Sequence, residues 1–101
     1  MLDAAREALS FAAGRSRGDL DRDRMLVLAI VKDVEIIGEA ASRTTATTRA
    51  AHADVPWAQI IAMRNRLIHA YFDVDLQVVW DTVTVDLPQL IAVLEPLVYG
   101  A

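Results

Sequence analysis

Apolar residues recur every three or four positions along most of the chain, which is the spacing of one face of an α-helix. The first such segment reaches Ala12 and ends at residues 14–19, where two glycines break the pattern. A second helix is predicted from near Asp21 to about Ser42. Its apolar face is formed by Ile30, Val34, Ile37 and Ala41. Strand patterns are nearly absent, so the sequence indicates an all-α protein.

The second half of the chain predicts further helices. Residues 44–54 are polar and β-branched, which is typical of a loop. Pro56 suits the first turn of a third helix, which is expected to run to about Tyr71. A fourth helix carries the apolar residues Leu76, Val79, Trp80 and Val83.

A fifth helix is predicted after a break at Asp86. Asp86 and Gln89 resemble a capping box for a helix from Leu90 onwards, ended or bent near Pro96. No repeat or low-complexity linker divides the chain. The pattern therefore predicts one domain, residues 1–101, folded as an up-and-down bundle of four to five helices.

The composition excludes several kinds of site. The chain has no cysteine, so it has no disulfide framework, thiol nucleophile or cysteine-based zinc site. The longest apolar run, residues 25–31, is too short to span a membrane. The first residues mix acids and bases, unlike a signal peptide. We therefore expect a soluble, cytoplasmic protein.

The charge restricts how this protein could meet a nucleic acid. The formal net charge is −4, and no broad basic stripe is evident. Contact with RNA would therefore depend on a few focused arginines. Hydrophobic residues make up 54% of the chain, more than a lone bundle of this size needs. The surplus predicts a subunit interface.

The polar stretch "RNRLIHAY", residues 64–71, stands out inside the predicted third helix. Arg64 falls in the middle of the apolar stripe, and burying its guanidinium without a partner would be costly. It therefore needs an acidic partner or must line a cleft. Asn65 and His69 are four positions apart and are neighbours on the adjoining flank. Tyr71 lies on nearly the same line as Arg64.

These side chains suit phosphodiester chemistry without a metal. The imidazole of His69 can remove the proton of a ribose 2′-hydroxyl or protonate the leaving oxygen. Arg64 can hold the phosphate with two parallel hydrogen bonds, Asn65 can orient either group, and Tyr71 can stack on a base. One helix supplies one imidazole, whereas acid–base cleavage often uses two. Two copies facing each other across a twofold axis would supply both.

Other interpretations of these residues stay open on spacing alone. Arg64 could pair with Glu35 or Glu39 across the bundle in a purely structural role. The cluster could also form a non-catalytic module that binds a nucleotide or a partner protein. Outside it, His52 has no ligand spacing to His69.

Two further residue pairs have ordinary structural interpretations. Trp57 and Trp80 lie on apolar faces and are expected in a core or an interface. Asp73 and Asp75 flank a helix break, where capping is the ordinary role of aspartate.

The chain resembles the HepT-like toxins of the HEPN superfamily over roughly residues 20–98. "RNRLIHAY" matches the R-x-x-x-x-H-x-Y signature of that superfamily. The segments "VEIIGEAAS" (34–42) and "VPWAQIIAMRNRLIHAYFDVDLQVVWDTVTVDLPQL" (55–90), in this order, resemble the HepT-like members that are paired with a minimal nucleotidyltransferase.

The resemblance implies an all-α homodimer whose two motifs face a shared cleft. It implies a metal-independent endoribonuclease toxin without a cofactor, in which Arg64 and His69 are catalytic and Asn65 supports them. Tyr71 matches the tyrosine to which the partner nucleotidyltransferase, an MntA-like antitoxin, adds AMP to neutralise the toxin. Arg66 points away from Arg64 by helical geometry and is expected to be a further RNA contact or a solvated surface charge.

Overall fold

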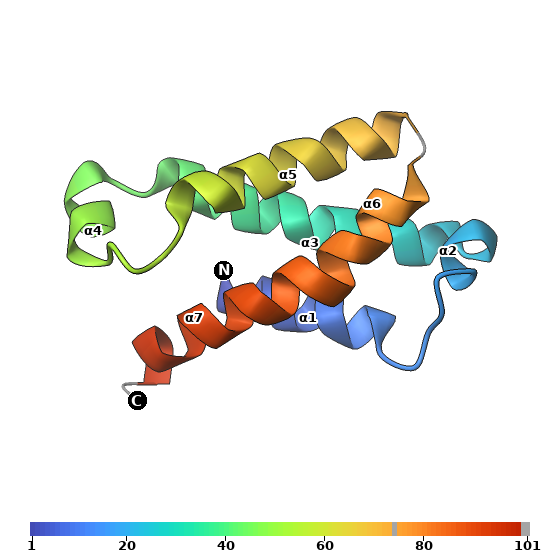
Figure 1. The fold of residues 1–101 in the computed structure, drawn as a ribbon, viewed down its shortest axis with the longest axis horizontal. Helices are drawn as coiled ribbons and strands as arrows, with labels where there is room; N and C mark the ends of the chain where they lie inside the picture. Colours follow the sequence, from blue (N-terminus) through green and yellow to red (C-terminus); the bar gives the residue numbers. More distant parts are fainter. Residues whose placement is uncertain (74, 100–101) are drawn as a thin grey trace.

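The computed structural model describes residues 1–73 and 75–99, apart from the side chains of Tyr71 and Tyr99. Three long helices pack against a C-terminal helical segment (Figure 1). The long helices are α1 (Leu2–Ala12), α3 (Arg24–Arg43) and α5 (Trp57–Phe72). The C-terminal segment runs through α6 (Leu76–Asp81), the π-helical turn η1 (Thr82–Asp86) and α7 (Leu87–Tyr99). Two short helices, α2 (Asp19–Arg22) and α4 (Ala46–Ala51), lie in the connections. The prediction of an all-α bundle is confirmed.

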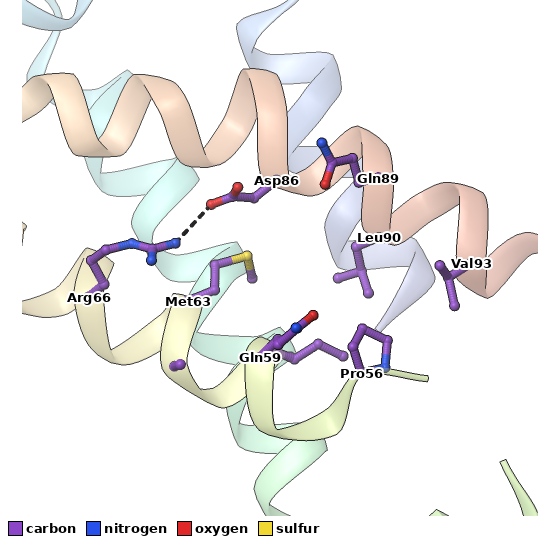
Figure 2. A pocket seen from close by; sticks show the side chains of 10 residues that line it. Pro56, Gln59, Met63, Arg66, Asp86, Gln89, Leu90 and Val93 are labelled. Carbon is purple, nitrogen blue, oxygen red and sulfur yellow. Dashed lines mark hydrogen bonds and ion pairs between the residues drawn. The ribbon is translucent and has the colours of Figure 1, made fainter. Parts of the chain in front are cut away.

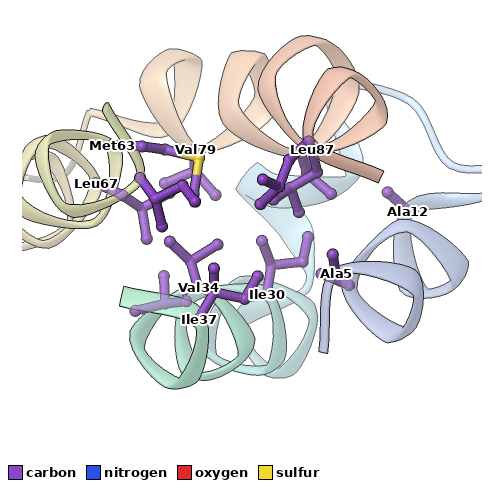
Figure 3. Packing of buried hydrophobic residues seen from close by; sticks show 14 of the residues in the cluster. Ala5, Ala12, Ile30, Val34, Ile37, Met63, Leu67, Val79 and Leu87 are labelled. Atoms are coloured by element: carbon purple, nitrogen blue, oxygen red, sulfur yellow. The ribbon is translucent and has the colours of Figure 1, made fainter. Parts of the chain in front are cut away.

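The core forms around α3, which packs against both α1 and α5. Figure 3 shows Val34 and Ile37 of α3 beneath Met63 and Leu67 of α5. Ile30, one turn earlier on α3, lies under Leu87. Burying each such aliphatic side chain stabilises the fold by about 1.5–3 kcal/mol. The apolar face predicted for this helix is therefore the face that builds the core.

Small residues let α1 lie close to α3. Ala5, Ala8 and Ala12 are buried along the inner face of α1. Asp33 of α3 is buried in the same region, only 3% exposed, and its Oδ2 has no hydrogen-bond partner within the described part of the chain. Burial and the neighbouring Glu7 carboxyl raise the pKa of Asp33 to about 6.

The central helix begins slightly later than its predicted start at Asp21. Asp23 is the N-cap of α3, and its carboxylate accepts a hydrogen bond from the backbone N–H of Leu26 at 3.1 Å. Residues before it form the separate short helix α2. Where the structure describes the chain, no helix is long and apolar enough to cross a membrane.

The predicted break at Asp86 is wrong, because α6, η1 and α7 follow one another without a gap. Pro88 has no N–H to donate to the carbonyl of Thr84, and the wider π-helical turn just before it accommodates the proline ring. Leu87 is fully buried, and this packing holds the helix in line. Pro96 lies within α7 and does not end it.

The loop predicted over residues 44–54 contains the helix α4. Its start is fixed by Thr45, whose hydroxyl accepts a hydrogen bond from the N–H of Thr48 at 3.1 Å. Arg49 ties it to the end of α3 by donating to the carbonyl of Ala41 at 2.6 Å. None of its residues is buried, so capping and this tether fix the helix, and burial does not.

Candidate active site

Helix α5 presents the polar cluster because its opposite side builds the core. Ile60, Met63 and Leu67 are buried there. The side turned away from the core carries Asn65, His69 and Phe72, and Arg64 lies on the flank between them and α3. We call these four residues the outer face of α5. Asn65, His69 and Phe72 are exposed, and Arg64 is half-buried.

Arg64 is positioned by a close approach of α5 to Gly38 of α3. A Cβ atom placed on Gly38 would lie 2.5 Å from the Cβ of Arg64 and closer still to its Cγ. Real Cβ contacts are essentially never this short, so the aliphatic stem of Arg64 occupies the space that any other residue at position 38 would need. The stem is buried against helix backbone and the guanidinium reaches the surface.

The guanidinium is held in place by its neighbour in the sequence. Nε of Arg64 donates to Oδ1 of Asn65 at 2.8 Å. Of the two possibilities left open for Arg64, an acidic partner is not found among the described residues, where Arg64 forms no ion pair and Glu39 pairs with Arg43 at 2.7 Å. The two terminal nitrogens of Arg64 therefore stay available for a bidentate contact with a phosphate or carboxylate.

His69 has a partner that the sequence interpretation missed. Its Nε2 lies 3.1 Å from Oδ2 of Asp73, and both side chains are mostly exposed. Asp73 was expected to cap a helix, but only Asp75 does so, accepting a hydrogen bond from the N–H of Val78 at 3.3 Å. The spacing of four residues between His69 and Asp73 was the signal that could have revealed the pair.

Arg66 lies on a different flank of α5 from Arg64. It forms an ion pair with Asp86 at 3.1 Å. Figure 2 shows this pair at one end of a pocket of about 420 Å³ between α5 and α7, with Pro56 and Val93 at the other end. Asp86 thus anchors Arg66 and caps no helix.

The remaining candidate residues lie apart from the outer face, or their side chains are outside the described part of the structure. Tyr71 belongs to α5 by its backbone, but its side chain lies outside the described residues. His52 contributes its carbonyl, which accepts a hydrogen bond from the indole of Trp57 at 3.1 Å. Trp57 and Trp80 pack half-buried against the core, as predicted. Over residues 1–73 and 75–99, no three acidic or histidine side chains gather as a metal site would require.

Comparisons with known proteins assign this chain to a family. The family model described as "Ribonuclease HepT-like" matches residues 1–97. A "Putative RNase" of Caldanaerobacter subterraneus subsp. tengcongensis is 40% identical over 77 residues, covering 76% of this chain and 69% of that protein. A "Probable ribonuclease HepT" of Thermococcus cleftensis is 41% identical over 68 residues, covering 67% of this chain and 62% of that protein.

More distant similarity extends over more of the chain. A "Putative RNase" of Methanocaldococcus jannaschii is 30% identical over 90 residues, covering 89% of this chain and 83% of that protein. No solved structure matches the chain. The fold is all-helical over the described residues, and the family match together with these relatives places the chain in the ribonuclease class. More narrowly, the chain belongs to the HepT-like ribonuclease family.

Proposed function

We propose that this protein is a metal-independent endoribonuclease in which Arg64 binds the scissile phosphate and His69 transfers protons. The observation that carries this proposal is the position of Arg64, whose stem packs on Gly38 and whose Nε is bound by Asn65. Asn65 lies between Arg64 and His69 on the outer face and supports the arginine. A guanidinium held in this way can stabilise the negative charge that develops on the phosphoryl oxygens during cleavage.

The proposed reaction uses the ribose 2′-hydroxyl as nucleophile. His69 removes its proton, the 2′-oxygen attacks phosphorus, and the bond from phosphorus to the 5′-oxygen breaks. The leaving oxygen takes up a proton, so the products are a 2′,3′-cyclic phosphate and a 5′-hydroxyl. A second imidazole is needed as the acid, and His69 of the partner subunit supplies it in a twofold homodimer.

Exposed apolar side chains support the dimer part of this proposal. Met25, Leu28 and Ile36 of α3 are 81%, 42% and 44% exposed, although they belong to the helix that builds the core. Covering such side chains in an isologous interface removes apolar area from water. The 54% hydrophobic content is then divided between one core and one subunit interface.

A partner protein would regulate the ribonuclease by modifying a residue of α5. We propose that Tyr71, the tyrosine of the R-x-x-x-x-H-x-Y pattern, is the residue that accepts AMP. An MntA-like nucleotidyltransferase antitoxin would join the phenolic oxygen of Tyr71 to the α-phosphate of ATP and release pyrophosphate. The added phosphate is an anion on the same helix as Arg64, where it would compete with RNA for the guanidinium.

An RNA cleavage assay in the presence of EDTA tests the proposal. We expect cleavage by the wild type and its loss in His69→Ala, because no other base would deprotonate the 2′-hydroxyl. His52→Ala is the matched control, since it removes the other histidine of the chain and should cleave like the wild type.

The alternative function predicts a different result. If a folded dimer with unmodified Tyr71 cuts no RNA, and His69→Ala loses binding of a nucleotide or of the nucleotidyltransferase, the outer face is a binding module without catalysis. Equal cleavage by the wild type and His69→Ala would remove His69 from the mechanism.

A further inference from the structure

The pocket between α5 and α7, which we call the α5–α7 pocket, combines an apolar lining with two amides (Figure 2). Ile60, Met63 and Leu90 are buried side chains that line it. Gln59 lines it from α5 and Gln89 from α7. Its volume of about 420 Å³ falls within the range of small-ligand sites, roughly 300–1,000 Å³. The α5–α7 pocket therefore has the size and the mixed lining of a site for a small polar ring.

The charges of the α5–α7 pocket cancel each other. Among the described residues that line it, only Arg66 and Asp86 are charged, and they pair at 3.1 Å. A free anion would have to compete with Asp86 for the guanidinium, whereas an uncharged group meets no such competition. The pocket therefore suits a neutral ligand with an apolar body and a polar edge, and an unpaired nucleobase has both.

Gln59 and Gln89 determine which polar edge the α5–α7 pocket suits. A glutamine amide offers an N–H donor and a carbonyl acceptor side by side. These two groups match adenine, whose exocyclic amino group donates and whose adjacent ring nitrogen accepts. Within residues 1–73 and 75–99, neither amide is hydrogen-bonded to another protein group. Met63 adds a thioether, which packs favourably against aromatic rings.

The α5–α7 pocket adjoins the candidate active site along α5. Arg66, at one end of the pocket, lies three residues before His69, and side chains three apart on a helix are neighbours. A helix rises about 1.5 Å per residue, so Met63 lies about 9 Å from His69 along the helix axis. A base in the pocket and a phosphate at His69 can therefore belong to adjacent nucleotides.

We infer that the α5–α7 pocket binds an unpaired adenine base next to the scissile phosphate. The amides of Gln59 and Gln89 bind the edge of the base, and Met63 contacts its ring. This inference rests on the proposed ribonuclease function for its ligand. It adds a base preference at the cleaved bond. It also requires an unpaired nucleotide, because a base in a duplex is stacked between its neighbours and cannot enter a pocket.

Binding measured in a His69→Ala background tests this inference without depending on cleavage. The probes are two fluorescent single-stranded RNAs, one of twelve uridines and one with a single adenosine at its centre, followed by anisotropy. We expect the adenosine RNA to bind about tenfold more tightly, because a bidentate contact discriminates between bases to this extent. Gln59→Leu and Gln89→Leu should each reduce this preference, since leucine cannot hydrogen-bond the base. Ala62→Phe should abolish it by filling the pocket from an exposed position of α5.

Gln77→Leu is the matched control for the two glutamine variants. Gln77 is the remaining glutamine of the chain, and its side chain donates to Asp81 on α6, away from the lining of the pocket. Its replacement should leave the preference for adenosine unchanged.

Three results would overturn the inference. The first is equal affinity of the His69→Ala protein for the two RNAs, or no binding of either. The second is a preference that survives in Gln59→Leu, Gln89→Leu and Ala62→Phe. The third is dissociation of the dimer by Ala62→Phe, seen by sedimentation, which would assign the pocket to a subunit interface.

Failure of the inference can be told apart from failure of the proposed function. A preference for adenosine that depends on Gln89, in a protein that never cuts RNA, would keep the α5–α7 pocket and remove the nuclease. Cleavage with no preference for bonds next to adenosine, together with equal affinity for the two RNAs, would keep the nuclease and remove the adenine site.

Discussion

The stem of Arg64 packs directly on the bare backbone of Gly38, so one glycine of α3 determines where the arginine of α5 lies. Arg64 is a charged residue within an apolar stripe of α5, and this contact shows how the fold accommodates it. The methylene groups bury apolar area between the helices, and the guanidinium meets Asn65 at the surface.

Gly38→Ala should damage both stability and cleavage. The added methyl group would overlap the Arg64 side chain, and such overpacking typically costs about 1–3 kcal/mol, more than the helix propensity gained from alanine. Urea denaturation and an RNA cleavage assay measure the two effects. Gly18→Ala is the control, because its Cβ would meet only the flexible end of Arg22 at 3.3 Å. Equal stability and equal cleavage rates of the two variants would contradict the packing of Arg64 against Gly38.

Asn65→Ala should lower cleavage without lowering stability. It removes the acceptor for Nε of Arg64, so the guanidinium is no longer held in one orientation toward the phosphate, and kcat/KM should fall about tenfold. The free energy of unfolding should be unchanged, because the side chain of Asn65 is exposed. Asn65→Asp keeps an acceptor and should retain more activity than Asn65→Ala. The opposite order would show that Asn65 acts otherwise than through Arg64.

Asp73→Asn should reduce kcat several-fold and leave KM nearly unchanged. The carboxylate of Asp73 orients the imidazole of His69, and loss of this orientation affects the chemical step more than RNA binding. Steady-state cleavage kinetics measure both parameters. The control is Asp75→Asn, which removes a carboxylate two residues away that caps α6 and does not contact His69. A rise in KM alone would assign Asp73 to RNA binding.

Asp33→Asn should stabilise the protein by an amount that grows with pH. The pKa of Asp33 is raised to about 6 by burial and by Glu7, from an ordinary value of 3.8. Below pH 3.8 the carboxyl is protonated in both states and nothing is lost. Between pH 3.8 and about 6 the unfolded state ionises first, so the wild type loses stability as pH rises, and above that window the loss is constant.

Urea denaturation at pH 4, 5, 6 and 7 measures this difference. The free energy of unfolding of Asp33→Asn minus that of the wild type should rise from near zero to on the order of 1–3 kcal/mol. Asp3→Asn replaces an exposed carboxyl on α1 and should show no such rise. A difference that stays constant across this range would mean that Asp33 is not the group that titrates.

The sequence by itself determined the long helices and the polar face of α5. Periodicity is a local property, so the spacing of Ile30, Val34 and Ile37 was enough to predict a buried face. The spacing of Arg64, Asn65 and His69 was likewise enough to make them neighbours, because a helix fixes which side chains adjoin within two turns. The same local signals failed at Asp86, where a capping pattern was present but burial of Leu87 kept the helix continuous.

Only the tertiary structure decided the contacts between residues far apart in the chain. The packing of Arg64 on Gly38 and the ion pair of Arg66 with Asp86 each join different helical segments. Such contacts depend on how close the helices approach and how they are rotated, which the packing of the whole core sets. No short window of sequence contains that information, and one of these contacts, that of Arg64 with Gly38, positions a residue of the candidate active site.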